Sequence, residues 1–70
     1  MIYLVAGLDR STLDRWHDHV MARDASAAAH IARGRAAGQG VDLVVAAVVG
    51  PCSSIEADAV ASGYLRPRAA

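Results

Sequence analysis

The chain has 70 residues with seven acidic and seven basic side chains, so its formal net charge is zero. A neutral chain produces no overall field that would attract nucleic acid or an anionic membrane. Its single cysteine excludes a disulfide within the chain, and no paired Cys or Cys/His spacing indicates a structural zinc site. We therefore expect no cofactor, and we expect self-association to supplement a core that 70 residues leave marginal.

The choice of residue types carries information about source and location. All seven basic residues are arginine, 16 residues are alanine, and lysine, asparagine and phenylalanine are absent. This bias is typical of a GC-rich bacterial genome. The apolar run at the N-terminus has no basic region before it and breaks at Asp9 and Arg10, so we expect neither a signal peptide nor a membrane span. The prediction is a cytoplasmic protein.

The first predicted element is a strand over residues 2–8, a short apolar run with β-branched and aromatic members. The sequence then centres on residues 24–50. Asp24 is a suitable N-cap for an alanine-rich helix over 25–37, which Gly38-Gln39-Gly40 is expected to close. A β-branched run over 41–49 predicts a second strand, stopped by Gly50-Pro51.

Residues 11–22 admit two interpretations. As a helix, they place an apolar stripe at i, i+3, i+4, i+7 and i+8, beginning at Leu13, with Ser11 and Asp14 as a capping box. As a strand, residues 15–22 alternate, with Trp16 and Val20 on one face. Asp24 begins the next helix so soon afterwards that a helix–helix turn has little room. This context favours the strand.

The C-terminal part predicts a short helix near 54–62, because Ser53-Ser54-Ile55-Glu56 resembles a capping box and Gly63 can end a helix. Residues 1–65 are expected to form one domain and residues 66–70 a flexible tail. The predicted fold is a small α+β domain: a single-layer sheet of about three strands in β-β-α-β order, packed on one helix, with a short C-terminal helix.

Both long strands are apolar on both faces, which normally means that both faces are covered. Strict alternation over 41–49 puts Val44, Ala46 and Val48 on one face and the remaining apolar residues on the other. If the helix covers the second of these faces, the first is left to the short predicted C-terminal helix, which offers only Ile55, Ala59 and Val60, or to a partner. We therefore expect a homodimer, joined face to face or edge to edge. The predicted interface consists of Tyr3, Val5, Val44, Ala46 and Val48.

Two histidines and the cysteine are candidates for ligand binding or pH sensing. On a strand, His17 and His19 face the same way, a spacing that metal-binding strands use, and histidine changes charge near neutral pH. Cys52 precedes the predicted C-terminal helix, where a thiol can become reactive. No third ligand and no general base is evident beside them, so partly exposed histidines and an inert cysteine are the simpler interpretation.

Four arginines offer an alternative function. If residues 11–22 were helical, they would form a helix-turn-helix-like pair with 24–37, and a basic face could contact nucleic acid. The candidate contacts are Arg15, Arg23, Arg33 and Arg35. Aspartates in the same region neutralise much of this charge.

Residues 5–11 together with 40–45 resemble universal stress proteins, which implies an α/β fold and, in some members, ATP binding. Residues 19–45 are similar to the small non-catalytic B subunit of phenylacetyl-CoA epoxidase complexes, which implies a strand–helix–strand scaffold protein. Neither resemblance transfers a functional residue to this chain. The residues themselves predict a small non-enzymatic oligomerising accessory or scaffold protein. Its partner is a second copy or a larger protein, and the alternative is a small nucleic-acid-binding regulator.

Overall fold

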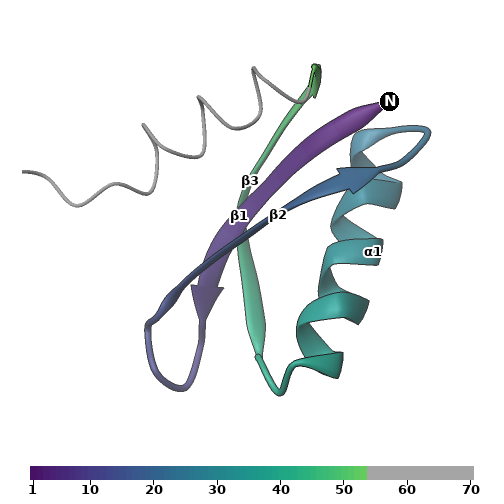
Figure 1. Ribbon diagram of the computed structural model, residues 1–70. Helices are drawn as coiled ribbons and strands as arrows, with labels where there is room; N and C mark the ends of the chain where they lie inside the picture. The colour runs from purple at the N-terminus through teal and green to yellow at the C-terminus, as the bar shows by residue number, and fades with distance from the viewer. Residues whose placement is uncertain (54–70) are drawn as a thin grey trace, which may run out of the picture.

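Strand β1 (Ile2–Asp9) is the central strand of an antiparallel sheet in the computed structural model, which describes residues 1–53. Strands β2 (Arg15–Met21) and β3 (Leu43–Cys52) pair with its two edges, giving the order β2-β1-β3. Helix α1 (Ala25–Gly38) connects β2 to β3 and packs on one side of the sheet (Figure 1). The predicted α+β fold in β-β-α-β order is confirmed. The C-terminal helix near 54–62, the domain limit at 65 and the tail lie outside the described residues.

Strand β2 confirms the strand interpretation of residues 15–22. It pairs with β1 without a register shift, so that Tyr3 lies opposite Val20, Val5 opposite Asp18 and Gly7 opposite Trp16. Opposite residues of an antiparallel pair point to the same face. The alternation of apolar and polar residues in β2 therefore follows the pleat, and this pairing outweighs the helical periodicity of the same segment.

Helix α1 begins and ends close to where the sequence predicts. The Oδ1 atom of Asp24 accepts a hydrogen bond from the Ala27 N–H at 2.8 Å, as expected of an N-cap. Gln39 caps the other end, and its backbone N–H donates to the carbonyl of Ala36 at 2.9 Å. The fully buried residues of the helix are all alanines, which lets the two layers approach closely.

The core lies between α1 and the sheet. Three alanines spaced one turn apart on the helix are completely buried, and four larger residues from the strands fill the space beneath them. The buried members of this core are Ala28, Ala32 and Ala36 of the helix and Tyr3, Val5, Val20 and Leu43 of the sheet. Because alanines leave space next to the helix axis, the core is filled by the sheet face that carries Tyr3 and Trp16.

Strand β3 contains a bulge that the strict alternation predicted from sequence does not include. Gly7 pairs with Val45 and Ala6 pairs with Ala47, so Ala46 is an extra residue with no counterpart on β1. The bulge reverses the alternation: Val48 packs in the core together with Val45, although the sequence pattern places them on opposite faces. The predicted face assignment of residues 46–49 is therefore wrong, because a single inserted residue shifts the period of two.

The prediction that Gly50-Pro51 ends the strand is also wrong, since β3 continues to Cys52. A second register shift, between Ile2 and Leu4 of β1, accommodates Gly50 and Pro51 in the strand. Gly50 has φ +144, and a Cβ atom there would lie 2.9 Å from the Ile2 carbonyl oxygen, so this position requires glycine. Pro51 is tolerated because β3 is an edge strand, where a missing N–H need not break the ladder.

The arrangement differs from the α/β fold implied by the resemblance to universal stress proteins, because β1 is antiparallel to both of its neighbours. Within residues 1–53, no helix has the length and apolar character needed to cross a membrane.

Candidate interaction surface

The sheet face opposite α1 is the main candidate site, and we call it the open face. No helix or strand among residues 1–53 lies across it. It is built from four rows, each with one residue from every strand, in the order β2, β1, β3. The rows are Arg15–Leu8–Val44, His17–Ala6–Ala47, His19–Leu4–Val49 and Met21–Ile2–Cys52.

The open face is apolar along β1 and β3 and polar along β2. Leu4 and Ala6, at the centre, are 1% exposed, and Leu4 packs with Ile2, Val49 and Cys52. The apolar residues near the ends of the face remain open to solvent. Leu8 is 39% exposed, Val44 41% and Met21 65%.

The structure divides the predicted interface between the two faces of the sheet. Tyr3 and Val5 are buried in the core beneath α1, and Val48 packs against that core, so these three are not on the open face. For Tyr3 and Val5, the prediction selected the face of β1 that the helix covers. For Val48, the bulge at Ala46 moves the side chain to the core face. Val44 is on the open face as predicted, and Ala46 is exposed at the bulge.

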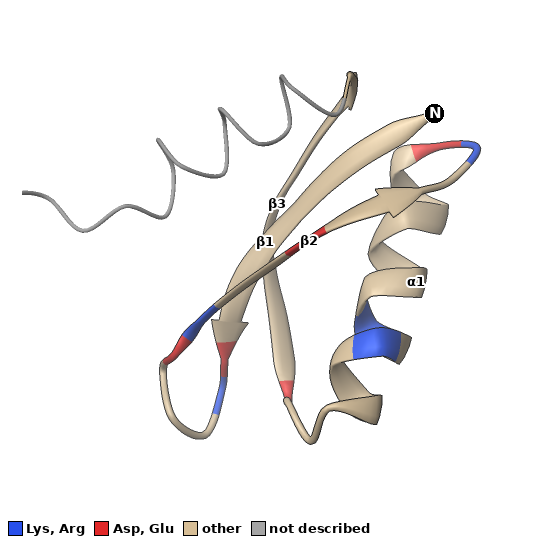
Figure 2. Ribbon diagram, in the orientation of Figure 1, with Lys and Arg blue, Asp and Glu red and all other residues tan. Residues whose placement is uncertain are grey.

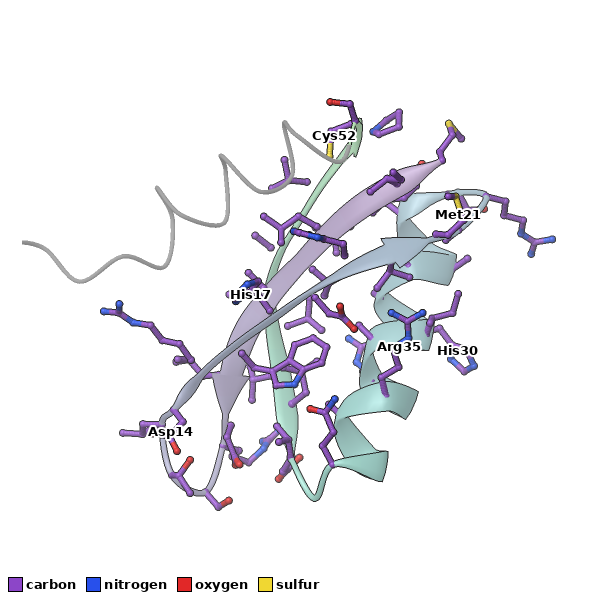
Figure 3. All side chains as sticks on the ribbon, in the orientation of Figure 1. Asp14, His17, Met21, His30, Arg35 and Cys52 are labelled. Atoms are coloured by element: carbon purple, nitrogen blue, oxygen red, sulfur yellow. The ribbon has the colours of Figure 1, made fainter. Side chains whose placement is uncertain are left out.

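His17 lies on the open face (Figure 3). His19 lies on the same face, and the two ring centroids are 6.3 Å apart with planes inclined by 55°. Cys52 lies at the far end of β3, where its Sγ contacts the Ile2 carbonyl oxygen at 3.6 Å. The central strand separates it from the histidines, and positions two strands apart are roughly 10 Å from each other. Among residues 1–53, no cluster of three or more His, Cys, Asp or Glu residues could hold a metal ion.

The four candidate arginines do not share one surface (Figure 2). Arg15 lies on the open face, whereas Arg33 and Arg35 belong to α1 on the other side of the sheet. Arg23, in the loop before α1, lies 3.5 Å from Asp24. Arg35 donates to the Asp18 carboxylate at 2.9 Å and to the His19 carbonyl at 3.2 Å. The basic face expected from a helix-turn-helix therefore does not form in this part of the chain.

The structure also contains a buried carboxylate, Asp9, which the sequence indicates only as the point where the N-terminal apolar run breaks. Asp9 is 8% exposed at the end of β1. Its Oδ1 accepts hydrogen bonds from the Ser11 hydroxyl at 2.7 Å and the Ser11 N–H at 2.9 Å. These bonds, the hydroxyl first, lower the pKa of Asp9 below its usual value, because they stabilise the charged form. The Asp-x-Ser spacing is the signal that could have identified this turn.

A second contact ties the sheet to the end of the helix. The Trp16 indole Nε1 donates to the Gln39 side-chain oxygen at 2.9 Å. Trp16 is half-buried and packs against the core. Together with the Arg35–Asp18 pair, this bond ties α1 to β2 on the core side of the sheet.

Comparison with known proteins identifies no relative. No family model matches the chain. No curated protein and no solved structure matches it either. The function is therefore argued from the residues and geometry described above.

Proposed function

We propose that this protein is a small non-enzymatic accessory or scaffold protein that acts by protein–protein association, with a second copy of the chain as its first partner. The observation that carries the proposal is the open face, which presents aliphatic side chains to solvent on the side of the sheet that α1 does not cover.

Two of the exposed apolar residues of this face lie side by side. Leu8 and Val44 are partners across β1 and β3, so their side chains adjoin on the same surface. Single exposed apolar residues are normal on protein surfaces, but adjoining ones that line a sheet face indicate a contact surface.

The free energy available is appreciable for a domain of this size. Burying a leucine or valine completely is worth roughly 1.5–3 kcal/mol. Since Leu8 and Val44 are 39% and 41% exposed, covering the remainder would contribute about 1 kcal/mol for each residue. A small domain has a total stability of only about 5 kcal/mol, so a partner that covers several such side chains stabilises the fold substantially.

Sedimentation velocity of the full chain, over a series of concentrations from micromolar to millimolar, tests the proposal. We expect a species of twice the chain mass of 7.3 kDa to grow with concentration. A single monomeric species throughout the series would contradict self-association. The same samples, applied to DNA and RNA at low and high salt, test the nucleic-acid alternative, which predicts retention that falls steeply with salt.

A further inference from the structure

We propose that two copies of the chain pair antiparallel along the outer edges of β3, so that their two three-stranded sheets join into one continuous sheet. This inference rests on the proposed function, because it specifies the surface and the geometry of the self-association. It is argued from the backbone groups at the two edges of the sheet, from the uncharged sequence of β3, and from the bulge at Ala46.

Side chains of the same chain occupy the outer edge of β2. The Ala22 N–H donates to the Met1 carbonyl oxygen at 2.9 Å, so the even-numbered backbone groups of this segment face β1 and the odd-numbered groups face outward. At the middle of that outer edge, the His19 N–H donates to Asp18 Oδ1 at 2.8 Å and the His19 carbonyl accepts from Arg35 at 3.2 Å. A strand added to β2 would have to break both bonds.

The outer edge of β3 lacks such bonds within residues 1–53. The Arg10 N–H donates to the Asp42 carbonyl at 2.8 Å, so the even-numbered groups before the bulge face β1 and those of Val45 face outward. After the bulge, Val48 lies opposite Val5, whose backbone groups face β2, so the groups of Val48 also face outward. No other group in this part of the chain bonds to the outward N–H and C=O groups of Val45 and Val48.

The sequence of β3 also lacks the charges that protect an exposed edge. Charged side chains on an edge strand discourage pairing with another chain. All ten residues of β3 are uncharged, and residues 43–49 are all aliphatic. Val44 is 41% exposed, and Val45, Val48 and Val49 are half-buried. Pairing along this edge covers the exposed parts of these four valines.

The bulge determines which strand can pair with this edge. Before the bulge, Val44 is on the open face and Val45 is on the face that α1 covers. After it, Val48 is on the face that α1 covers and Val49 is on the open face. A strand with strict alternation matches these faces on one side of the bulge and reverses them on the other. A second copy of β3 carries the same bulge, so it can match both sides.

A two-fold axis perpendicular to the sheet, between Ala46 and Ala47, brings the two bulges together. It places Val45 opposite Val48 of the partner subunit, with both side chains on the face that α1 covers. Because the backbone groups of both residues face outward, the two residues exchange N–H and C=O hydrogen bonds, and the symmetry repeats this pair on the other side of the axis. The alanines at the axis are small, so the bulged segments can meet there.

The same axis pairs the valines of the open face and limits the assembly to two copies. Val44 lies opposite Val49 of the partner subunit, a cross-strand pair of β-branched side chains. Pro51 has no N–H to donate, but it lies beyond the paired segment. The joined sheet has β2 at both of its edges, where Asp18 and Arg35 occupy the backbone groups, so a third copy is excluded.

Amide hydrogen exchange of the full chain, measured by NMR at concentrations where sedimentation shows mainly monomer or mainly dimer, tests the pairing. The amides of Val45 and Val48 should exchange more slowly in the dimer by about tenfold or more, because they become hydrogen-bonded. The amides of His17 and Met21, on the outer edge of β2, are the internal control and should keep their rates. A dimer that leaves Val45 and Val48 unchanged, or that slows His17 and Met21, would overturn this inference and leave the proposed function intact. A chain that stays monomeric at every concentration would overturn both.

Two lysine substitutions, compared by sedimentation velocity, give a second readout. Ala46→Lys places a charge at the exposed bulge, next to the axis, and we expect it to weaken the dimer by about tenfold or more. His30→Lys is the matched control, because His30 is exposed on α1 and points away from the sheet (Figure 3). The control should keep the dissociation constant within about twofold. Equal dissociation constants for wild type and both variants would show that the dimer does not form along β3.

Discussion

Gly7 of β1 lies directly against the backbone of Val44 on β3, so closely that a Cβ atom on Gly7 would overlap the Val44 carbonyl oxygen. This approach occurs beside the bulge at Ala46, where β3 gains its extra residue. The obstacle is backbone rather than a flexible side chain, so it cannot move without disturbing the pairing of the two strands. Gly7 is therefore a requirement of the bulge, and the bulge decides which residues of β3 reach the open face.

We expect Gly7→Ala to lower the free energy of unfolding by about 3 kcal/mol, because overpacking against backbone forces the strands apart. Urea unfolding followed by circular dichroism measures the change. Gly34→Ala is the matched control: Gly34 lies within α1 with nothing near its Cβ position, and alanine is the better helix former. The free energy of unfolding of the control should rise by about 0.5–1 kcal/mol. Equal effects of the two substitutions would contradict the close approach.

Much of the fold follows from the sequence because the signals that set it are local. Asp24 predicts the helix start, the alanine run predicts the helix that follows, and alternation predicts which residues of β2 share a face. These signals act within a few residues of each other. The choice of strand over helix for residues 15–22 needed only the short distance to Asp24.

The faces of the sheet could not be predicted in the same way, because they depend on contacts between distant segments. Alternation shows that Tyr3 and Val5 share a face but not which face the helix covers. The bulge at Ala46 is set by the pairing of β1 with β3, and its only sign in the sequence is Gly7 inside an apolar strand. For this reason the predicted interface contained three residues that belong to the core or its margin.

Leu13, in the hairpin between β1 and β2, has φ +64, a left-handed conformation that is unfavourable for a bulky side chain. Its N–H donates to the Asp9 carbonyl at 2.7 Å, which holds the residue in this conformation. We expect Leu13→Asn to raise the free energy of unfolding by about 1 kcal/mol, because asparagine tolerates left-handed backbone. Leu13→Val should lower the free energy of unfolding, since β-branched residues tolerate left-handed backbone least. Thermal unfolding of the two variants decides, and the opposite ranking would contradict this explanation.

The lowered pKa of Asp9 predicts acid sensitivity. The charged form is stabilised in the folded protein, so the contribution of Asp9 is complete above the pKa of the unfolded chain, for which 3.8 is the usual value. It declines as the pH falls below that value and is lost below the lower pKa of the folded state. Asp9→Asn should therefore be less stable than wild type at pH 7, and the difference should shrink towards pH 2.

Urea unfolding at several pH values measures this dependence. Ser11→Ala removes the hydroxyl that contributes most to the lowered pKa, and should therefore reduce the acid sensitivity in part. Asp14→Asn is a suitable control on the same hairpin, because it changes another aspartate without removing the Ser11 bonds. A difference between wild type and Asp9→Asn that stays constant with pH would contradict the assignment.

Arg35 closes the outer edge of β2 by its bonds to Asp18 and to the His19 carbonyl. The side chains of Arg35 and Asp18 are 46% and 36% exposed, so Arg35→Ala should cost no more than about 1 kcal/mol of stability. Its larger effect should be on association, because the uncovered His19 carbonyl gives an added strand an acceptor. We expect Arg35→Ala to form larger species than wild type at high concentration, measured by light scattering. Arg33→Ala, on the same helix, should behave as wild type, and identical scattering from all three proteins would show that Arg35 does not protect the edge.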